Sequence, residues 1–537
     1  MEMLKSLFHV GGKPFFSIGG QVNNSSAYDR ESYCRALNAV KEMGMNTVAA
    51  PIYWETLEPC CGQYCFDQVE MVISETEKRG LKAVLLWFGS WKNGTSRYIP
   101  EWMKQDRNTY RTCQSRNGFS TAILSPLCHN SMEKDARAFQ ELMSYVEKRN
   151  ASGTVLAVQV ENEPGLLGVP RDYSPEADSL FFAPVPEELA VFLSSLSEGR
   201  VYKCFQDAGG KKGCNFPETF GFHAQELFSA YFMAKYVEYV AAKGKSVSAL
   251  PLYVNVWIGE QQFQIPGIDF PSGGATALAL DIWKHFAPHL DCISPDVYQN
   301  DLENYMKRCS SYHRKDNLLY IPESRIDKRN GKHLLRALQF HELSSIHCFG
   351  IDSIWNDDGS LLPGARDFKD TVTILRSMKP LIEKYQGTGR LCAVAQYDGM
   401  DDQLFDFGDY YGRVAFLNCI RDEPYIHLDS HHYEENYMDQ DGVGLIVYEG
   451  NGSFYLAGRG YKLLLLKKGD IDEMADTLYS YRFLSVRNIP YLQVEEGYFD
   501  DDGAFVPTRK RNGDETDTGL WVTPDIGVLH ARLLAVT

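Results

Sequence analysis

The sequence predicts an α/β protein built on a (β/α)8 TIM barrel that is followed by a C-terminal all-β, sandwich-like accessory domain. Three observations lead to this prediction. Eight short apolar or β-branched runs alternate with stretches of helical periodicity, a pattern typical of βα units and a parallel sheet. Two of the intervals between these runs are much longer than the others. Near residue 388 the helical periodicity gives way to strand-like runs between Gly, Asn and Asp turns.

The expected barrel strands are each five to seven residues long, and eight of them are enough to close a barrel. They are Phe15–Gly19, Thr47–Ile52, Ala83–Phe88, Val155–Glu161, Leu252–Trp257, Cys292–Asp296, Leu318–Pro322 and Cys348–Ser353. Between them lie amphipathic segments with apolar positions three or four residues apart, which predict helices. These helices are Arg30–Met43, Val69–Arg79, Lys134–Arg149, Ala224–Lys243 and His333–Glu342.

The two long intervals follow the third and fourth expected strands and contain the insertions Gly89–Asn130 and Gly165–Phe222. In a barrel of this type, insertions after strands lie at the end of the barrel where active sites are built. We therefore expect both insertions to form walls of a substrate pocket.

The domain organisation follows from the change in pattern. Residues 1–387 are predicted to form the catalytic barrel with its two insertions, and residues 388–537 the all-β domain. The strand-like runs of the second domain occupy residues 393–407, 412–420, 442–469 and 481–501.

Composition indicates the kind of partner. The chain has 44% hydrophobic and 23% charged residues, ordinary for a globular protein, and a net charge of −17. That charge repels nucleic acids and anionic membranes, so neither is expected as a partner. Aromatic residues make up 13% of the chain, which suits either stacking against sugar rings or a rich core. A small carbohydrate is the expected ligand, and association into a homo-oligomer is left open.

The N-terminal residues and the cysteines point to a cytoplasmic protein. The first sixteen residues contain no apolar run typical of a signal peptide, and no later stretch is long enough to span a membrane. Thirteen scattered cysteines fit reduced thiols. Cys60, Cys61 and Cys65 lie close together, but no second pair follows at ligand spacing, so no metal site is expected there.

Two strand ends carry carboxylates suited to glycoside hydrolysis, which needs one carboxylic acid and one carboxylate on either side of the bond. The fourth strand ends VQVENEPG, which places Glu161 and Glu163 on one side of the strand if it stays extended that far. The seventh ends YIPESR, where Arg325 would favour an ionised Glu323. The alternatives are an acidic loop cap and a surface Glu–Arg pair.

Together, these two motifs resemble those of clan A retaining glycosidases, particularly the β-galactosidases of glycoside hydrolase families 35 and 42. The resemblance implies that Glu163 is the acid/base, Glu323 the nucleophile, Asn162 a ligand of the sugar 2-hydroxyl and Glu161 a supporting residue. Further segments look similar to a branch of family 35 with a C-terminal β domain. They are APIYWETLEPCCGQYCFD, LWFGSWKNG, PLYVNVW, SPDVYQND, FGIDSIW and RKRNGDETDTG.

The same resemblance implies that Tyr298 donates a hydrogen bond to the nucleophile. Four tryptophans end or follow barrel strands, and we expect two of them to contact the sugar while the others pack in the core: Trp54, Trp87, Trp257 and Trp355. Polar residues at similar positions are candidate ligands for hydroxyls: Glu55, Lys92 and Asn93. Pro164 and the CCGQYC segment depart from the family pattern, which leaves the sugar specificity open.

The expected activity is that of a retaining exo-glycosidase, a β-galactosidase that releases terminal β-linked galactose without a cofactor. An α-L-arabinosidase, β-glucosidase or β-glucuronidase with the same mechanism is the first alternative. A non-catalytic sugar-binding barrel is the second. In the enzyme, Glu163 must be protonated at rest and Glu323 ionised.

Overall fold

The computed structural model describes residues 6–259, 264–419, 440–468, 491–517 and 519–534. Parts of three predicted strand-like runs, residues 420, 469 and 481–490, lie outside the described residues, as does residue 518 of the last motif. The chain divides into two compact units. The first comprises Met1–Tyr298, Lys307–Arg325 and Ser344–Ile354, and the second comprises Gln299–Met306, Ile326–Leu343 and Trp355–Thr537. Among the described helices, none combines the length and apolar character that crossing a membrane requires.

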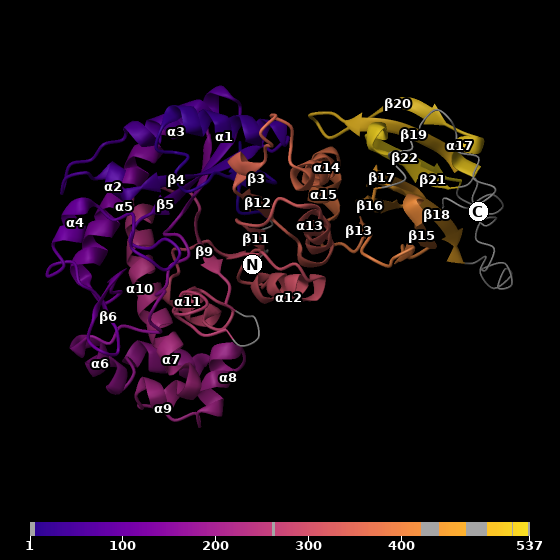
Figure 1. Ribbon diagram of the computed structural model, residues 1–537. Coiled ribbons are helices and arrows are strands. Elements are labelled where there is room, and N and C mark those ends of the chain that lie inside the picture. The colour runs from indigo at the N-terminus through magenta and orange to yellow at the C-terminus, as the bar shows by residue number, and fades with distance from the viewer. Residues whose placement is uncertain (1–5, 260–263, 420–439, 469–490, 518, 535–537) are drawn as a thin grey trace. The chain divides into compact units, whose positions relative to one another are not determined.

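The first unit is built around eight parallel strands, which confirms the predicted TIM barrel (Figure 1). In chain order these are β3 Ile18–Gln21, β4 Thr47–Tyr53, β5 Lys82–Phe88, β8 Val155–Gln159, β9 Leu252–Trp257, β10 Cys292–Asp296, β11 Tyr320–Ile321 and β12 Ser345–Phe349. Each strand pairs with the next barrel strand in the chain except β10 with β11, and β12 pairs with β3. Closure between β10 and β11 occurs just beyond the strands, where the Val297 N–H donates to the Glu323 carbonyl oxygen at 2.9 Å.

Amphipathic helices follow most of these strands, largely where periodicity predicted them. Those of the first unit are α1 Arg30–Glu42, α2 Trp54–Leu57, α3 Asp67–Lys78, α5 His129–Arg149, α10 Ala224–Lys245 and α11 Leu280–Phe286. Helix α12, Leu302–Tyr312, spans both units. Helix α1 shows how the sequence sets a boundary, because the Asp29 side chain caps it by accepting the Ser32 N–H at 2.8 Å.

The two long intervals contain small elements of their own. The first holds α4 Glu101–Gln105 and the hairpin β6 Thr112–Gln114 with β7 Ser120–Leu124. The second holds α6 Pro175–Phe182, α7 Glu187–Ser195, α8 Arg200–Asp207 and α9 Phe216–Phe220. Near the N-terminus, β1 His9–Val10 pairs with β2 Lys13–Pro14.

The second unit contains the predicted all-β region. Its six-stranded antiparallel sheet has the order β13-β16-β17-β22-β19-β20, and its four-stranded sheet the order β14-β15-β18-β21. The strands are β13 Leu391–Ala395, β14 Asp402–Asp406, β15 Tyr410–Phe416, β16 Val443–Gly450, β17 Ser453–Arg459, β18 Tyr461–Lys467, β19 Tyr491–Phe499, β20 Phe505–Arg511, β21 Leu520–Val522 and β22 Val528–Leu533. Buried residues of both sheets, among them Leu456 and Leu463, form one hydrophobic core.

Helices precede the sheets of the second unit: α13 Lys328–His341, α14 Pro363–Ser377 and α15 Lys379–Tyr385, with the short α17 Asp514–Asp517 near the end. A domain boundary between residues 387 and 388 stays a prediction. All thirteen cysteines are free thiols, with Cys60 and Cys61 exposed and Cys65 half-buried.

Candidate functional site

Three buried carboxylates meet at the carboxyl ends of the barrel strands. Glu163 follows β8, Asp296 ends β10 and Glu323 follows β11, with exposed fractions of 6%, 2% and 5%. One carboxylate oxygen of each residue lies within 4.8 Å of those of the other two. The structure therefore brings together both carboxylates singled out in the sequence and adds a third.

The chain after β8 is not extended, although the prediction for Glu161 and Glu163 assumed that the strand continues in an extended form as far as Glu163. Strand β8 ends at Gln159, and these two glutamates have φ angles of 61° and 47°, in the left-handed region. The prediction that their side chains share one side of an extended strand is therefore wrong. This strained backbone is held by the Asn255 side chain, whose Oδ1 accepts the Glu163 N–H at 2.8 Å.

Glu161 belongs to a separate buried network beside the site. Its Oε2 accepts the Trp91 N–H at 2.7 Å. Burial and the neighbouring carboxylate of Asp135 raise the pKa of Glu161 well above its ordinary value. Asp135 in turn accepts hydrogen bonds from the Trp87 indole at 2.8 Å and the Ser90 hydroxyl at 2.5 Å. Glu161 thus supports the turn and lies apart from the three clustered carboxylates, as expected of a supporting residue.

Glu323 is surrounded by hydrogen-bond donors. Gln21 Nε2 donates to its Oε1 at 2.7 Å, Asn255 Nδ2 approaches the same oxygen at 3.5 Å, and the Tyr298 hydroxyl donates to Oε2 at 2.9 Å. Donors on both oxygens favour the ionised form of a carboxylate. The Arg325 Nε donates to the Tyr298 carbonyl oxygen at 3.2 Å, so this cation is joined to the residue that contacts Glu323.

The other two carboxyls of the cluster favour the protonated form. Burial, followed by the charge of Glu323, raises the pKa of Glu163 to about 7. The same two causes raise the pKa of Asp296 well above its ordinary value. The site therefore separates its carboxyls by environment: hydrogen-bond donors surround Glu323, whereas the protonated form is favoured for Glu163 and Asp296.

Polar groups next to Glu163 are placed to receive a ligand. Lys92 Nζ donates to Asn162 Oδ1 at 2.9 Å, which orients the amide so that its Nδ2 is the remaining donor. Within the described part of the chain, that buried Nδ2 and the buried Oδ1 of Asn93 have no hydrogen-bond partner. Buried polar groups are rarely left unsatisfied, so both atoms fit groups that bind a hydroxyl.

The four tryptophans differ in accessibility. Trp54 and Trp87 are fully buried, their rings are 6.1 Å apart, and their indole N–H groups already donate to Glu58 and Asp135. Both therefore pack in the core, in line with the expectation that two of the four tryptophans do so, and which tryptophans contact a sugar stays a prediction. Trp257 is partly exposed and lies opposite Asp296 in the sheet register.

Two further candidates are Trp355 and Glu55. Trp355 belongs to the second unit and has 37% of its surface exposed. Its role as a sugar ligand stays a prediction. Glu55 accepts hydrogen bonds from the Tyr28 hydroxyl at 2.7 Å and the Lys104 ammonium at 3.0 Å.

Sequence reasoning missed three polar residues of the site: Gln21, Asn255 and Asp296. Each left a signal in the sequence. Asp296 is an acidic residue at the end of a predicted strand, Gln21 follows the first predicted strand, and Asn255 is the one polar residue in the run LYVNVW. A polar side chain near the carboxyl end of a barrel strand is the pattern that points to function.

A cluster of three carboxylate oxygens is also a set of ligands that a hard divalent cation accepts. Both Glu323 oxygens, however, already accept hydrogen bonds from Gln21 and Tyr298. The proton affinity of Glu163 and Asp296 likewise opposes the fully ionised state that a cation prefers. The arrangement suits proton transfer and nucleophilic attack better than cation binding.

Two family models match the chain. Residues 7–237 match the model described as glycosyl hydrolases family 35, and residues 368–523 match a domain of unknown function, DUF5597. No curated protein matches the chain.

Several solved structures are similar in fold. The catalytic domain of β-amylase from Paenibacillus polymyxa is 14% identical, with a TM-score of 0.47, and the match covers 66% of this chain and 97% of that one. A β-galactosidase from the Antarctic haloarchaeon Halorubrum lacusprofundi is 16% identical, with a TM-score of 0.49 and coverage of 67% and 58%. A catalytic mutant of a GH42 β-galactosidase from G. stearothermophilus is 17% identical, with a TM-score of 0.49 and coverage of 70% and 58%.

This chain thus spans nearly the whole β-amylase domain but less than two thirds of either β-galactosidase. The family 35 match includes Asn162 and Glu163 together with the first four barrel strands, which agrees with the resemblance seen in the motifs. The chain therefore resembles glycoside hydrolases, with a match to the family 35 model over residues 7–237 and a match to the DUF5597 model over residues 368–523.

Proposed function

We propose that the chain is a retaining exo-β-galactosidase that releases terminal β-linked galactose from oligosaccharides by double displacement. The observation that supports this most strongly is the short separation of Glu163 and Glu323, whose nearest oxygens lie within 4.8 Å. Retaining glycosidases hold their two carboxyls about 5–5.5 Å apart, whereas inverting enzymes leave about 6.5–9.5 Å for a water molecule.

In the first step, Glu323 attacks the anomeric carbon while Glu163 protonates the oxygen of the leaving group. The bond from the anomeric carbon to that oxygen breaks as the bond to the Glu323 carboxylate forms. Hydrogen bonds from Gln21 and Tyr298 orient the Glu323 carboxylate for the attack. Burial keeps the proton on Glu163, as a general acid requires.

In the second step, Glu163 is a carboxylate and accepts a proton from water. That water attacks the anomeric carbon from the side the leaving group vacated, and Glu323 departs. Two inversions give net retention of configuration. Asn162 is placed to donate through its unsatisfied Nδ2 to the sugar 2-hydroxyl, an interaction that strengthens in the transition state.

Galactose is proposed as the sugar because the motifs resemble β-galactosidases and residues 7–237 match family 35. The same two carboxylates would serve an α-L-arabinosidase, a β-glucosidase or a β-glucuronidase. The buried donors around Glu323 and the proton on Glu163 are features of a catalytic site, and they speak against a barrel that only binds sugar.

The test is a panel of p-nitrophenyl glycosides with NMR detection of the first anomer released. We expect the β-galactoside to be the best substrate, with β-galactose as the initial product. A 2-deoxy-2-fluoro-β-galactoside should label Glu323, identified by peptide mass spectrometry. Initial release of α-galactose would exclude retention, a dominant glucuronide signal would exclude the galactose assignment, and absence of both turnover and adduct would favour the binding protein.

A further inference from the structure

Asp296 is the member of the carboxyl cluster to which the proposed mechanism gives no part. It ends β10 with 2% of its surface exposed, and one of its oxygens lies within 4.8 Å of oxygens of both Glu163 and Glu323. A carboxyl buried beside two others is unfavourable unless hydrogen bonds or a proton stabilise it. The groups that stabilise Asp296 therefore decide what it can do in the site.

One oxygen of Asp296 has a fixed partner. Asn255 Nδ2 donates to Asp296 Oδ2 at 2.8 Å, and the Oδ1 of the same amide accepts the Glu163 N–H at 2.8 Å. These two bonds set the orientation of the amide, because its oxygen can only accept and its nitrogen can only donate. Asp296 Oδ2 is thus an acceptor, and Asn255 joins Asp296 to the peptide group of the proposed acid/base.

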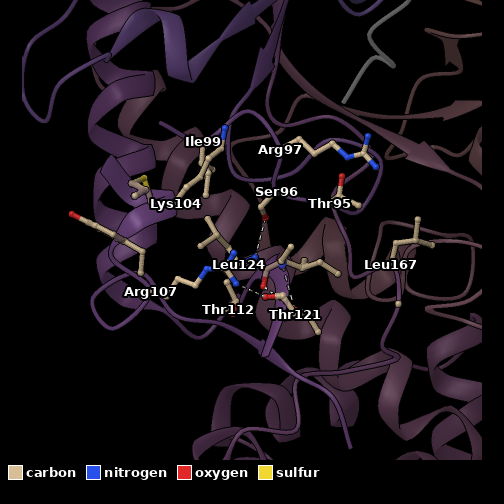
Figure 2. A pocket seen from close by; sticks show the side chains of 15 residues that line it. Thr95, Ser96, Arg97, Ile99, Lys104, Arg107, Thr112, Thr121, Leu124 and Leu167 are labelled. Carbon is tan, nitrogen blue, oxygen red and sulfur yellow. Dashed lines mark hydrogen bonds between the residues drawn. The ribbon is translucent and has the colours of Figure 1, made fainter. Parts of the chain in front are cut away.

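The other oxygen of Asp296 receives no such donor. Oδ1 is buried, and no amide, amine or hydroxyl group of the described residues donates to it. The pocket of about 550 Å³ in the insertion after β5 supplies none either, since none of its lining residues belongs to the cluster (Figure 2). The carboxyl of Glu163 is the group that hydrogen-bonds Asp296. Two carboxylates can only accept, so this bond requires a proton on one of them.

The effects on the two pKa values indicate which carboxyl is the donor. Burial is the largest cause that raises the pKa of both Asp296 and Glu163, and the charge of Glu323 follows. Their mutual hydrogen bond acts in opposite directions, because it raises the pKa of Asp296 and lowers that of Glu163. A hydrogen bond has these effects when Asp296 donates it, since it then stabilises the charged form of Glu163.

The remaining groups around Asp296 leave this proton in place. The titratable and charged groups that face Asp296 are Glu163, Glu323, Lys92, Tyr253, Tyr298 and Tyr320. Burial and both glutamates, which raise the pKa of Asp296, outrank the charge of Lys92, which lowers it. Burial also raises the pKa of each of the three tyrosines, so all three are uncharged near neutral pH.

We propose that Asp296 is a positioning residue of the acid/base: as a carboxylic acid it donates a hydrogen bond to Glu163 and stabilises the Glu163 carboxylate that forms between the two steps. This rests on the proposed function, in which the proton of Glu163 passes to the leaving oxygen and is replaced from water. Asp296 keeps its own proton throughout and forms no bond to the sugar. Its O–H compensates the buried charge on Glu163 for as long as the glycosyl intermediate lasts.

Two substitutions at this position test the proposal. Asp296→Asn keeps an acceptor for Asn255 and supplies an N–H donor for Glu163, as a protonated Asp296 does, whereas Asp296→Ala removes both. The leaving group of 2,4-dinitrophenyl β-galactoside needs no proton. With this substrate we expect Asp296→Ala to release a burst of dinitrophenolate and then to turn over about tenfold more slowly than the parent, as loss of a hydrogen bond to a charged group predicts. Asp296→Asn should turn over close to the parent rate.

The pH profile separates this role from a structural one. Loss of a donor to the Glu163 carboxylate raises the pKa of Glu163, so the alkaline limb of kcat/KM for lactose should move to higher pH in Asp296→Ala. In Asp296→Asn the limb should keep its parent position. The control is Asp291→Ala, just before the other end of β10, where the exposed carboxylate lies 2.7 Å from the Lys245 ammonium. It should change neither the rate nor the limb.

Two results would overturn the proposal. One is an Asp296→Asn enzyme as slow as Asp296→Ala, because the ionised carboxylate of Asp296 would then be the required form. The other is an Asp296→Ala enzyme with the turnover and pH profile of the parent. If Asp296→Ala does not fold, Asp296→Leu takes its place, since leucine has a similar shape and no donor.

Infrared difference spectra of the free protein separate this proposal from the proposed function. The spectrum of the parent minus that of Asp296→Asn, recorded near neutral pH, should contain the carbonyl band of a protonated carboxyl. If this band is present but no glycoside is hydrolysed, the proposed function fails while the proton on Asp296 stands. Hydrolysis of the β-galactoside with retention, but without this band, would refute the role of Asp296 alone.

Discussion

At the residue scale, the chemistry depends on three neighbouring carboxyls that differ in their hydrogen-bond donors, their burial and the charges next to them. Glu323 receives donors from Gln21 and Tyr298, whereas burial and the nearby charge keep protons on Glu163 and Asp296. Like charges at this separation cannot all be ionised in a buried site. One carboxyl is thus surrounded by donors and two favour the protonated form, a division that suits a nucleophile and an acid.

The raised pKa of Glu163 predicts the alkaline limb of the activity profile. The acid must be protonated to assist the leaving group, so kcat/KM should fall about tenfold per pH unit above the pKa of about 7. In Glu163→Ala, an activated 2,4-dinitrophenyl galactoside should still form the intermediate, this limb should disappear, and azide should restore turnover as β-galactosyl azide. An α-azide product would mean that Glu163 is not the acid/base.

The donors to Glu323 predict that its position depends on Gln21. Replacing Gln21 by Leu removes the 2.7 Å hydrogen bond to Oε1 of Glu323. We expect kcat/KM to fall about 10–100-fold, the cost of losing a hydrogen bond to a carboxylate. The matched control is Gln140→Leu on α5, where the side chain binds Ser246 at the surface. An unchanged kcat/KM in Gln21→Leu would argue against this role.

At the element scale, the barrel depends on close approach between β3 and β12. A Cβ atom added to Gly19 would lie 2.3 Å from the His347 ring. That ring cannot yield easily, because it is buried and bonded to the Ser17 hydroxyl at 2.8 Å and the Tyr320 hydroxyl at 2.9 Å. Small residues at such positions are therefore required by the sheet itself.

Gly19→Ala should lower the free energy of unfolding by about 2 kcal/mol, as overpacking a buried site does, measured by urea denaturation. The control is Gly364→Ala in α14, where the nearest atom to an added Cβ is 3.3 Å away and the backbone is helical. If Gly19→Ala were as stable as the parent, β3 and β12 could move apart to accommodate the added methyl group without lowering the free energy of unfolding.

At the scale of the whole molecule, the two units have separate cores, and all the clustered carboxylates belong to the first. Phe454 is fully buried in the shared core of the two antiparallel sheets of the second unit. Phe454→Ala should destabilise that unit by about 3–5 kcal/mol through the cavity it leaves. Calorimetry should show a lowered transition, while kcat/KM at 25 °C stays at the parent value. Loss of activity in the folded variant would mean that the second unit contributes to the site.

Local patterns in the sequence were enough to predict the order of the elements. The eight barrel strands, an all-β C-terminal region and five of the longer helices follow from periodicity, and the carboxyl-terminal ends of two strands point to Glu163 and Glu323. Boundaries were less certain, because β8 ends at Gln159 where the apolar pattern continues to Val160. The turn that follows depends on a hydrogen bond from the Glu163 N–H to the side chain of Asn255, which lies 92 residues away in the sequence.

The sequence by itself therefore determined the fold class and the two candidate carboxylates. The reason is that periodicity and a strand-end motif are each local patterns, formed by residues only a few positions apart in the chain. Only the tertiary structure decided which side chains meet. It brings Asp296, Gln21 and Asn255 to the site, and it buries Trp54 and Trp87 in the core. The reason is physical. Desolvation, charge separation and access to a ligand depend on distances across the barrel, and these distances exist only after the chain has closed.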